Sequence, residues 1–341
     1  MRVLEIREPF GIDSLAFVTR PRPVPGPHQV LLHLRALSLN YRDRLVIEGI
    51  ARWRPAGPRV PVSDGVGSVV AVGSDVSRVR EGQRVAPIFY PRWVDGGPRT
   101  DKMQAALGGA MADGVYAEYV LADESSVVAL PTHLTDEEAA TLPCAGVTAW
   151  NAVAERVKPQ AGDTVVVLGT GGIGLFVLQF AHRLGARVIV TSSSDDKLER
   201  AKALGAAAGI NYRTHSDWPG RVRDLTKGEG AEVVVDSAGA LVDAVNAVRV
   251  GGTVSFVGLL GEHRSHVDLV RLMGSSATIH AIDVGSRAMF EAMNGFIEST
   301  GLRPVIDRVF EFDEAHEALR YFAGGTHFGK VCIRGRTQLG S

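Results

Sequence analysis

The stretch Val167-Leu168-Gly169-Thr170-Gly171-Gly172-Ile173-Gly174 decides the fold of this chain of 341 residues. A run of β-branched residues precedes it, and apolar residues at helical spacing, Leu175, Leu178 and Ala181, follow it. Valine-rich runs favour strands, glycines favour tight turns, and apolar residues three or four apart favour one face of a helix. The stretch therefore predicts a strand, a glycine turn and a helix in direct succession.

The same alternation continues along the chain from residue 163. Further strands are predicted over residues 188–190, 233–235 and 254–257, with stretches of helical periodicity between them. One helix is expected from about Asp195 to Leu204, with Ser194 as its N-cap and Gly205 at its end. Strands that are apolar on both faces and alternate with helices are typical of a doubly wound parallel sheet.

The glycine spacing in the turn, G-x-G-x-x-G, adds a chemical prediction. One glycine permits the tight turn, one lets the backbone approach a pyrophosphate closely, and one lets the helix pack against the strand. The start of the helix then presents N–H groups and the positive end of its dipole to the phosphates. A purely structural glycine turn is the alternative, but the strand and helix on either side favour a dinucleotide site on a Rossmann domain.

The end of the second strand distinguishes between the two nicotinamide dinucleotides. NAD sites place a carboxylate there, whereas this sequence has Thr191-Ser192-Ser193-Ser194. Hydroxyls donate to a 2′-phosphate, and Lys197 one turn later supplies a counter-charge. If Asp195 and Asp196 point inward, their negative charges disfavour a bound 2′-phosphate. Lys197 could also be an ordinary solvated surface lysine. The sequence favours NADPH over NADH.

Composition limits the remaining possibilities. The net charge of −1 gives no electrostatic basis for binding nucleic acid or anionic membranes, and no apolar run is long enough to span a bilayer. The start of the sequence does not resemble a signal peptide, and the two cysteines, Cys144 and Cys332, are too few for a disulfide framework. We therefore expect a cytoplasmic protein that acts on a small molecule.

Short strands punctuated by glycine and proline are predicted in the first third of the chain. An irregular loop from Pro91 to Gly114 follows them.

Several segments together resemble the medium-chain dehydrogenase/reductase superfamily over nearly the whole chain. These segments are residues 39–43 (LNYRD), 61–67 (PVSDGVG), 73–85, 140–150 (ATLPCAGVTAW) and 328–330 (FGK). The resemblance implies a GroES-like β-barrel catalytic domain from residues 1–146 and 284–341, and a Rossmann domain from residues 147–283. It also implies a homodimer joined through the Rossmann sheets.

The residues that depart from this pattern concern zinc. In zinc-dependent members Asn40 would be a cysteine, Ser63 a histidine, and Cys144 the third ligand. An amide and a hydroxyl are poor zinc ligands, and residues 86–114 lack the four cysteines of the structural zinc lobe. The sequence therefore predicts no zinc and no other metal. His263 and His266 form the one close histidine pair, which we interpret as surface residues, and Cys144 as a small buried residue.

Among zinc-free members the sequence is similar to quinone oxidoreductases and enoyl reductases, in which Asn40 and Tyr41 would face the nicotinamide. The resemblance places cofactor contacts at these positions: Thr148, Gly171, Gly172, Ile173, Ser192, Ser193, Lys197, Tyr212, Gly258, Leu259, Leu260, Ile282, Phe328 and Lys330. Asp43 is expected to anchor its loop through backbone hydrogen bonds, and Asp64 to pair with Arg42 or Arg44.

Three functions remain open at this point. The first is NADPH-dependent reduction of a quinone or an α,β-unsaturated carbonyl, with Asn40 and Tyr41 as catalytic residues. The second is an NAD(P)-dependent alcohol dehydrogenase or carbonyl reductase. The third is a non-catalytic NADPH-binding protein.

Overall fold

The computed structural model describes residues 1–258, 260 and 264–336, which form two compact units. The first unit combines Met1–Val147 with the described residues from Gly285 onward, and the second is Thr148–Val284. The domain boundaries expected from the sequence lie within one residue of these divisions. The positions Leu259 and His263 fall outside the described residues.

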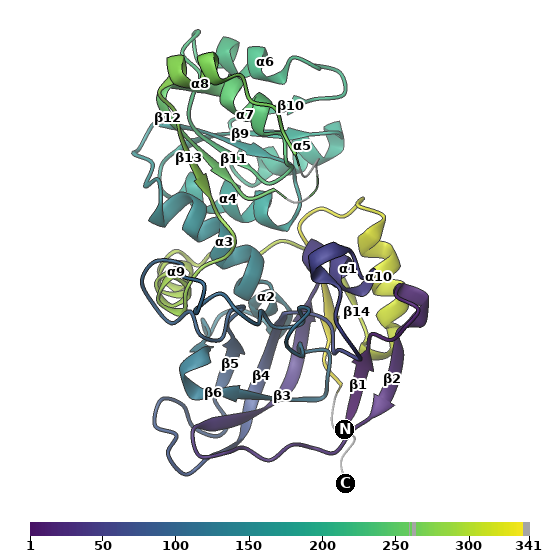
Figure 1. Ribbon diagram of the computed structural model, residues 1–341. Coiled ribbons are helices and arrows are strands. Elements are labelled where there is room, and N and C mark those ends of the chain that lie inside the picture. The colour runs from purple at the N-terminus through teal and green to yellow at the C-terminus, as the bar shows by residue number, and fades with distance from the viewer. Residues whose placement is uncertain (259, 261–263, 337–341) are drawn as a thin grey trace. The chain divides into compact units, whose positions relative to one another are not determined.

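The second unit is built on one parallel sheet, which Figure 1 shows with helices on both sides. Its strand order is β10-β9-β8-β11-β12-β13, and every neighbouring pair is parallel. The strands are β8 (Thr164–Leu168), β9 (Arg187–Ser192), β10 (Ala208–Asn211), β11 (Ala231–Asp236), β12 (Val248–Phe256) and β13 (Thr278–Ala281). This is the doubly wound order in which the chain reverses direction across the sheet between β8 and β11.

Helices connect these strands and bury the sheet. They are α3 (Val147–Trp150), α4 (Gly172–Arg183), α5 (Asp195–Ala203), α6 (Trp218–Leu225), α7 (Leu241–Ala247) and α8 (Leu269–Ser275). Every residue of β8 is buried because both faces of the sheet are covered, which explains its uninterrupted valines. The predicted cap of α5 is confirmed: the Ser194 hydroxyl accepts from the Lys197 amide, and Gly205, with a φ of +108°, follows the helix.

The first unit contains a seven-stranded, mainly antiparallel sheet in the order β14-β15-β3-β4-β5-β7, with β6 also paired to β3. Its strands are β3 (Gln29–Ser38), β4 (Asp64–Val72), β5 (Arg84–Pro87), β6 (Tyr119–Asp123), β7 (Val127–Ala129), β14 (Ile306–Phe310) and β15 (Lys330–Arg334). A separate pair, β1 (Arg2–Glu5) and β2 (Ala16–Thr19), lies beside it (Figure 1). Strand β3 pairs with β6 along its first half and with β15 along its second, so both ends of the chain share one core.

The α-helices in the described part of this unit are α1 (Tyr41–Ile47), α2 (Asp136–Ala140), α9 (Arg287–Thr300) and α10 (Ala315–Ala323). Residues 91–114 contain only turns and bends, as the sequence predicted. No described helix is both long enough and apolar enough to cross a membrane.

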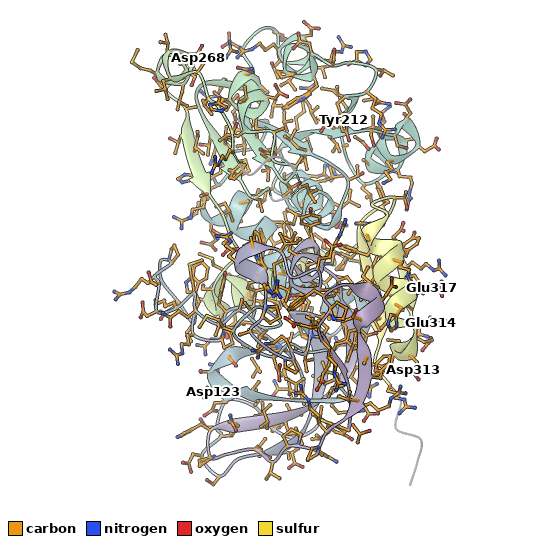
Figure 2. The ribbon with its side chains drawn as sticks, turned by 45° about the vertical axis from the view of Figure 1, so that its right-hand side comes forward. Asp123, Tyr212, Asp268, Asp313, Glu314 and Glu317 are labelled. Carbon is orange, nitrogen blue, oxygen red and sulfur yellow. The ribbon has the colours of Figure 1, made fainter. Side chains whose placement is uncertain are left out.

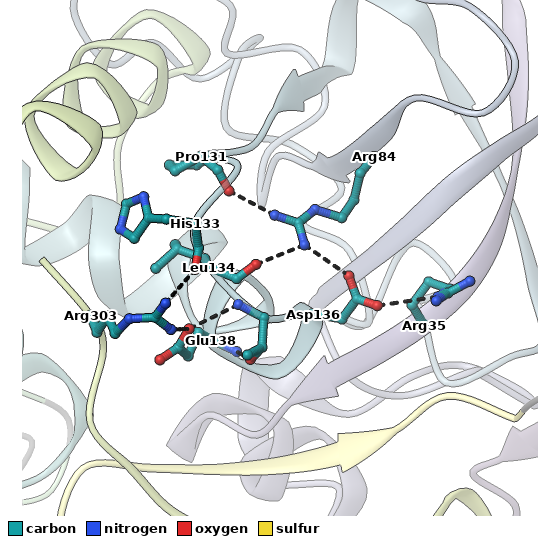
Figure 3. Close-up of polar contacts among 9 residues, drawn as sticks. Arg35, Arg84, Pro131, His133, Leu134, Asp136, Glu138 and Arg303 are labelled. Carbon is teal, nitrogen blue, oxygen red and sulfur yellow. Dashed lines mark hydrogen bonds and ion pairs between the residues drawn. The ribbon is translucent and has the colours of Figure 1, made fainter. Parts of the chain in front are cut away.

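Arginines fix the segment that leads into α2, as Figure 3 shows. Arg84 donates to the carbonyls of Pro131 and Leu134 at 2.7 and 2.8 Å, and it pairs with Asp136 at 3.2 Å. Arg303, from beyond α9, pairs with Glu138 at 2.7 Å. These contacts hold the start of a continuous helical run that leads through α2 and the π-helical turn Leu142–Gly146 to Cys144.

Candidate active site

In the second unit, the predicted cofactor contacts gather at one edge of the parallel sheet. Most of them follow the carboxyl end of a different strand: Gly171 follows β8, Ser192 ends β9, Tyr212 follows β10, Gly258 follows β12 and Ile282 follows β13. Because all six strands run parallel, these ends lie along the same edge. This edge is where doubly wound sheets bind their ligands.

The glycine turn leaves the start of α4 open. Gly171 is the N-cap of α4 and provides no side-chain hydrogen bond to the helix, in contrast to Ser194 at α5. A Cβ atom on Gly171 would meet nothing within 4 Å, whereas one on Gly174 would lie 2.2 Å from the Gly169 carbonyl oxygen. The N–H groups of the first turn, which includes Gly172 and Ile173, have no partners within the helix. The turn therefore fits a pyrophosphate: it has donors, a positive dipole end and space.

The end of β9 presents hydroxyl groups. The Ser192 hydroxyl accepts a hydrogen bond from the Ser194 amide at 3.3 Å, which leaves its own O–H as a donor. Ser193 and Lys197 are half-buried on the same turn. Asp195 is exposed, and its carboxylate accepts a hydrogen bond from the Asn211 side chain at 2.9 Å.

The other predicted contacts in this unit differ in exposure. Tyr212, labelled in Figure 2, is 44% exposed, and Leu260 is 58% exposed. Ile282 is buried and donates its N–H to the Phe256 carbonyl at 2.8 Å. Thr148 is buried on α3, and its hydroxyl donates to the Asp283 carbonyl at 3.4 Å.

Sequence reasoning missed the turn after β11. Buried Asp236 accepts from the amides of Ala238 and Gly239 at 2.9 and 2.8 Å, and Ser237 donates to the Leu168 carbonyl at 2.6 Å. A Cβ atom on Gly258 would lie 2.3 Å from the Gly239 nitrogen, so this turn contacts the predicted site directly. The sequence signal that could have predicted this turn was Asp236 at the end of a valine-rich strand, followed by Gly239.

In the first unit, a buried chain of hydrogen bonds surrounds Asn40. Asn40 is the N-cap of α1 and is 8% exposed. The Lys330 ammonium, from the start of β15, donates to Asn40 Oδ1 and to the Leu39 carbonyl, each at 2.6 Å. Asn40 Nδ2 donates to Ser63 Oγ at 3.4 Å, and Ser63 donates to Asp64 Oδ1 at 2.7 Å.

Burial controls the protonation of this cluster. It raises the pKa of Asp64 to about 6, although the Lys330 ammonium and hydrogen bonds from neighbours act in the opposite direction. The other carboxylate oxygen of Asp64 accepts from the Cys144 amide at 3.1 Å. Burial, reinforced by the Asp64 charge, raises the pKa of the Cys144 thiol well above its ordinary value. Cys144 is therefore a thiol at neutral pH, but the residue is half-buried and not fully buried as the sequence had indicated.

The expected ion pair between Asp64 and Arg42 or Arg44 is wrong. Arg44 pairs with Glu48 at 2.6 Å, and Arg42 lies 3.7 Å from Asp43. Asp64 is held by Ser63 and the Cys144 amide instead, because it is completely buried under the start of α1. Asp43 behaves as predicted: its carboxylate accepts a hydrogen bond from the backbone N–H of Asn40 at 2.8 Å and so fixes the loop.

The cluster does not fit a zinc ion. Zinc binds thiolate, imidazole or carboxylate ligands, and it repels a neighbouring ammonium. Here Asn40 and Ser63 hold two of the ligand positions, and Lys330 brings a positive charge. Within the described part of the chain, no group of three or more histidine, cysteine or acidic residues could hold a metal.

Of the other residues predicted for this unit, Tyr41 is the first residue of α1 and is half-buried, and Phe328 is buried before β15. The aromatic residues of the 89–93 segment are largely packed. The Arg42 guanidinium lies over the Phe89 ring, 4.6 Å from the ring centre, and the Trp93 indole N–H donates to the Gly96 carbonyl. Among the residues predicted for this unit, Asn40 and Lys330 therefore have the best-defined polar contacts.

Comparison with known proteins gives two family matches. The alcohol dehydrogenase GroES-like domain family matches residues 26–132, and the zinc-binding dehydrogenase family matches residues 172–299. A zinc-type alcohol dehydrogenase-like protein of Schizosaccharomyces pombe is 39% identical over 319 residues, which is 91% of each chain. These matches confirm the predicted fold class, a GroES-like domain with a Rossmann domain.

Two further similarities concern substrate and cofactor. A 2-methylene-furan-3-one reductase of Solanum lycopersicum is 33% identical over 313 residues, which is 89% of this chain and 71% of that protein. The structure of a mycobacterial protein complexed with NADPH has a TM-score of 0.81 and 27% identity, covering 98% of this chain and 99% of that one.

Proposed function

This chain belongs to the medium-chain dehydrogenase/reductase superfamily and is an oxidoreductase, and from that premise we propose that it reduces a quinone or an α,β-unsaturated carbonyl with NADPH and without zinc. One observation carries the proposal. The position that a catalytic zinc would need is occupied by an amide held by a buried ammonium. Such a site offers hydrogen-bond donors, which suffice for a conjugated substrate whose added charge spreads onto an oxygen.

The cofactor assignment rests on the sheet edge described above. The start of α4, with Gly171, Gly172 and Ile173, would hold the pyrophosphate, and the turn at Gly239 and Gly258 adds backbone close by. Ser192, Ser193 and Lys197 would hold the 2′-phosphate through two hydroxyls and one ammonium. The bound NADPH supplies the hydride from its nicotinamide ring.

The chain's own residues would stabilise the charge that develops on the substrate. The Asn40 amide and the Tyr41 hydroxyl, both at the start of α1, would donate to the substrate oxygen. After hydride addition to the conjugated carbon, a proton from Tyr41 or from water completes the reduction. Asp43 keeps the start of α1 in place.

A second candidate is an NAD(P)-dependent alcohol dehydrogenase or carbonyl reductase, which the name of the Schizosaccharomyces pombe relative favours. An unconjugated ketone needs stronger polarisation than one amide and one hydroxyl supply, so we rank this function second. Third is a protein that binds NADPH without catalysis.

A panel of acceptors separates these functions. NADPH oxidation is followed with a quinone, an enone and a simple aldehyde at equal concentrations. The proposal predicts turnover of the quinone or the enone at least 10-fold above the aldehyde. Preference for the aldehyde would favour the second function, and binding of NADPH without turnover of any acceptor would favour the third.

We also propose a cytoplasmic homodimer. Strand β13 forms one edge of the Rossmann sheet, and its backbone on that side is not paired within the described residues. On neighbouring α8, Leu269, Val270 and Met273 are 74–75% exposed. A second copy would cover both the edge and these side chains. Light scattering should give twice the chain mass, and Leu269→Glu should reduce it to that of one chain. A monomeric wild-type protein would exclude the dimer.

A further inference from the structure

Lys330 is only 3% exposed, and its ammonium determines which group donates and which accepts in a short chain of hydrogen bonds. An ammonium can donate hydrogen bonds but cannot accept them. The Asn40 atom at 2.6 Å from Lys330 must therefore be the amide oxygen, Oδ1. This removes the usual ambiguity between the oxygen and nitrogen of an asparagine side chain.

The remainder of the chain follows from this first step. With Oδ1 held by Lys330, Asn40 Nδ2 faces the opposite way, toward Ser63 Oγ at 3.4 Å. Ser63 can accept there because its own proton is donated to Asp64 at 2.7 Å. The direction therefore runs from an ammonium through an amide and a hydroxyl to a carboxyl group, and the Asn40 side chain also interacts with the Asp64 carboxyl group itself.

We propose that Lys330 is a positioning residue, which turns the Asn40 amide so that its N–H, and not its carbonyl oxygen, faces the substrate oxygen. This inference deepens the proposed function and rests on it. Without the ammonium the amide could rotate by 180°, and its oxygen would then repel the charge that develops in the reaction. The role differs from the cofactor contact that the family resemblance implies for Lys330, and the two roles can be separated.

A double-mutant cycle tests the proposal. Lys330→Met and Asn40→Ala are made singly and together, and kcat with the best acceptor and the Kd for NADPH are measured for each. Loss of one positioned donor typically lowers kcat about 100-fold. We expect each single variant to lower kcat by about that factor, the double variant to be no more than about 3-fold worse, and the Kd to change less than about 3-fold.

Other outcomes would overturn it. Multiplicative losses in kcat would show that Lys330 does not act through Asn40. A rise of more than about 10-fold in the Kd for NADPH with unchanged kcat would make Lys330 a cofactor contact instead. Lys202→Met, which removes a surface lysine paired with Glu199, is the matched control and should leave kcat and Kd unchanged. If Lys330→Met does not fold, Lys330→Leu replaces it in the cycle, because a leucine side chain still fills much of the space and has no hydrogen-bond donor.

A readout without turnover separates this inference from the proposed function. In a chain labelled with ¹⁵N-asparagine, the Asn40 side-chain NH₂ protons should show nuclear Overhauser contacts to the Ser63 β protons, and these should weaken in Lys330→Met. Unchanged contacts would refute the positioning role even if no acceptor were reduced. Inactive wild-type protein with the expected contacts would refute the proposed function alone.

Discussion

Replacing three glycines by alanine, one at a time, tests the dinucleotide site in depth. Gly171 has φ −79° and ψ −170°, which alanine adopts readily, and an added Cβ meets no protein atom within 4 Å. Gly171→Ala should therefore leave the free energy of unfolding unchanged. The methyl group would, however, enter the space in which the pyrophosphate approaches the backbone.

The size of the effect follows from ordinary overpacking. Forcing a methyl group into a filled site costs about 1–3 kcal/mol, which corresponds to a Kd for NADPH about 5- to 150-fold weaker. Gly174→Ala differs, because its Cβ would lie 2.2 Å from the Gly169 oxygen in the protein itself. That variant should lose both stability and NADPH affinity.

Gly295, inside α9, is the matched control. Its Cβ would meet nothing within 4 Å, and alanine is favoured over glycine in a helix by about 1 kcal/mol. Gly295→Ala should therefore raise the free energy of unfolding and leave the Kd unchanged. The assays are denaturant unfolding and fluorescence titration with NADPH. A Gly171→Ala variant that binds NADPH within 2-fold of wild type would refute the placement of the pyrophosphate at α4.

Two further predictions concern charge. Lys197→Ala should raise the Kd for NADPH about 10-fold or more, because hydrogen bonds to charged groups contribute about 1.5–3 kcal/mol, and it should change the Kd for NADH less than 2-fold. Lys202→Ala on the same helix is the control. Equal losses of affinity for both dinucleotides would contradict the 2′-phosphate assignment. Burial raises the pKa of Asp64 from 3.8 to about 6, so the folded state favours the protonated form, and its contribution to stability is full below about pH 4 and is lost as pH rises through 6. The free energy of unfolding of wild type relative to Asp64→Asn should thus fall by about 3 kcal/mol between pH 3 and pH 7, and a difference independent of pH would show that the carboxyl group is not desolvated.

The sequence predicted the Rossmann unit well because its signals are local. The glycine spacing, the valine-rich strand β8 and the cap of α5 at Ser194 each depend on residues close in the chain. The carboxyl ends of parallel strands then fall at one edge by geometry alone, so contacts far apart in sequence could be predicted together.

The polar cluster around Asn40 could be predicted only in part. Lys330 lies 290 residues from Asn40 in the chain, and nothing local indicates that its ammonium faces the amide rather than a ligand. Asp64 was assigned to a neighbouring arginine because charge pairing is the simplest expectation for an aspartate. The structure buries it completely, and there a hydroxyl and a backbone amide are its partners.

In the proposed function, hydride transfer depends on hydrogen-bond donors and not on zinc. The most direct measurement is the rate of NADPH oxidation with the preferred acceptor, together with the metal content of the same sample, before and after dialysis against a chelator and after zinc is restored. We expect a constant rate in protein that holds far less than one zinc per chain. A rate that falls with removal of zinc and returns with its addition would contradict it.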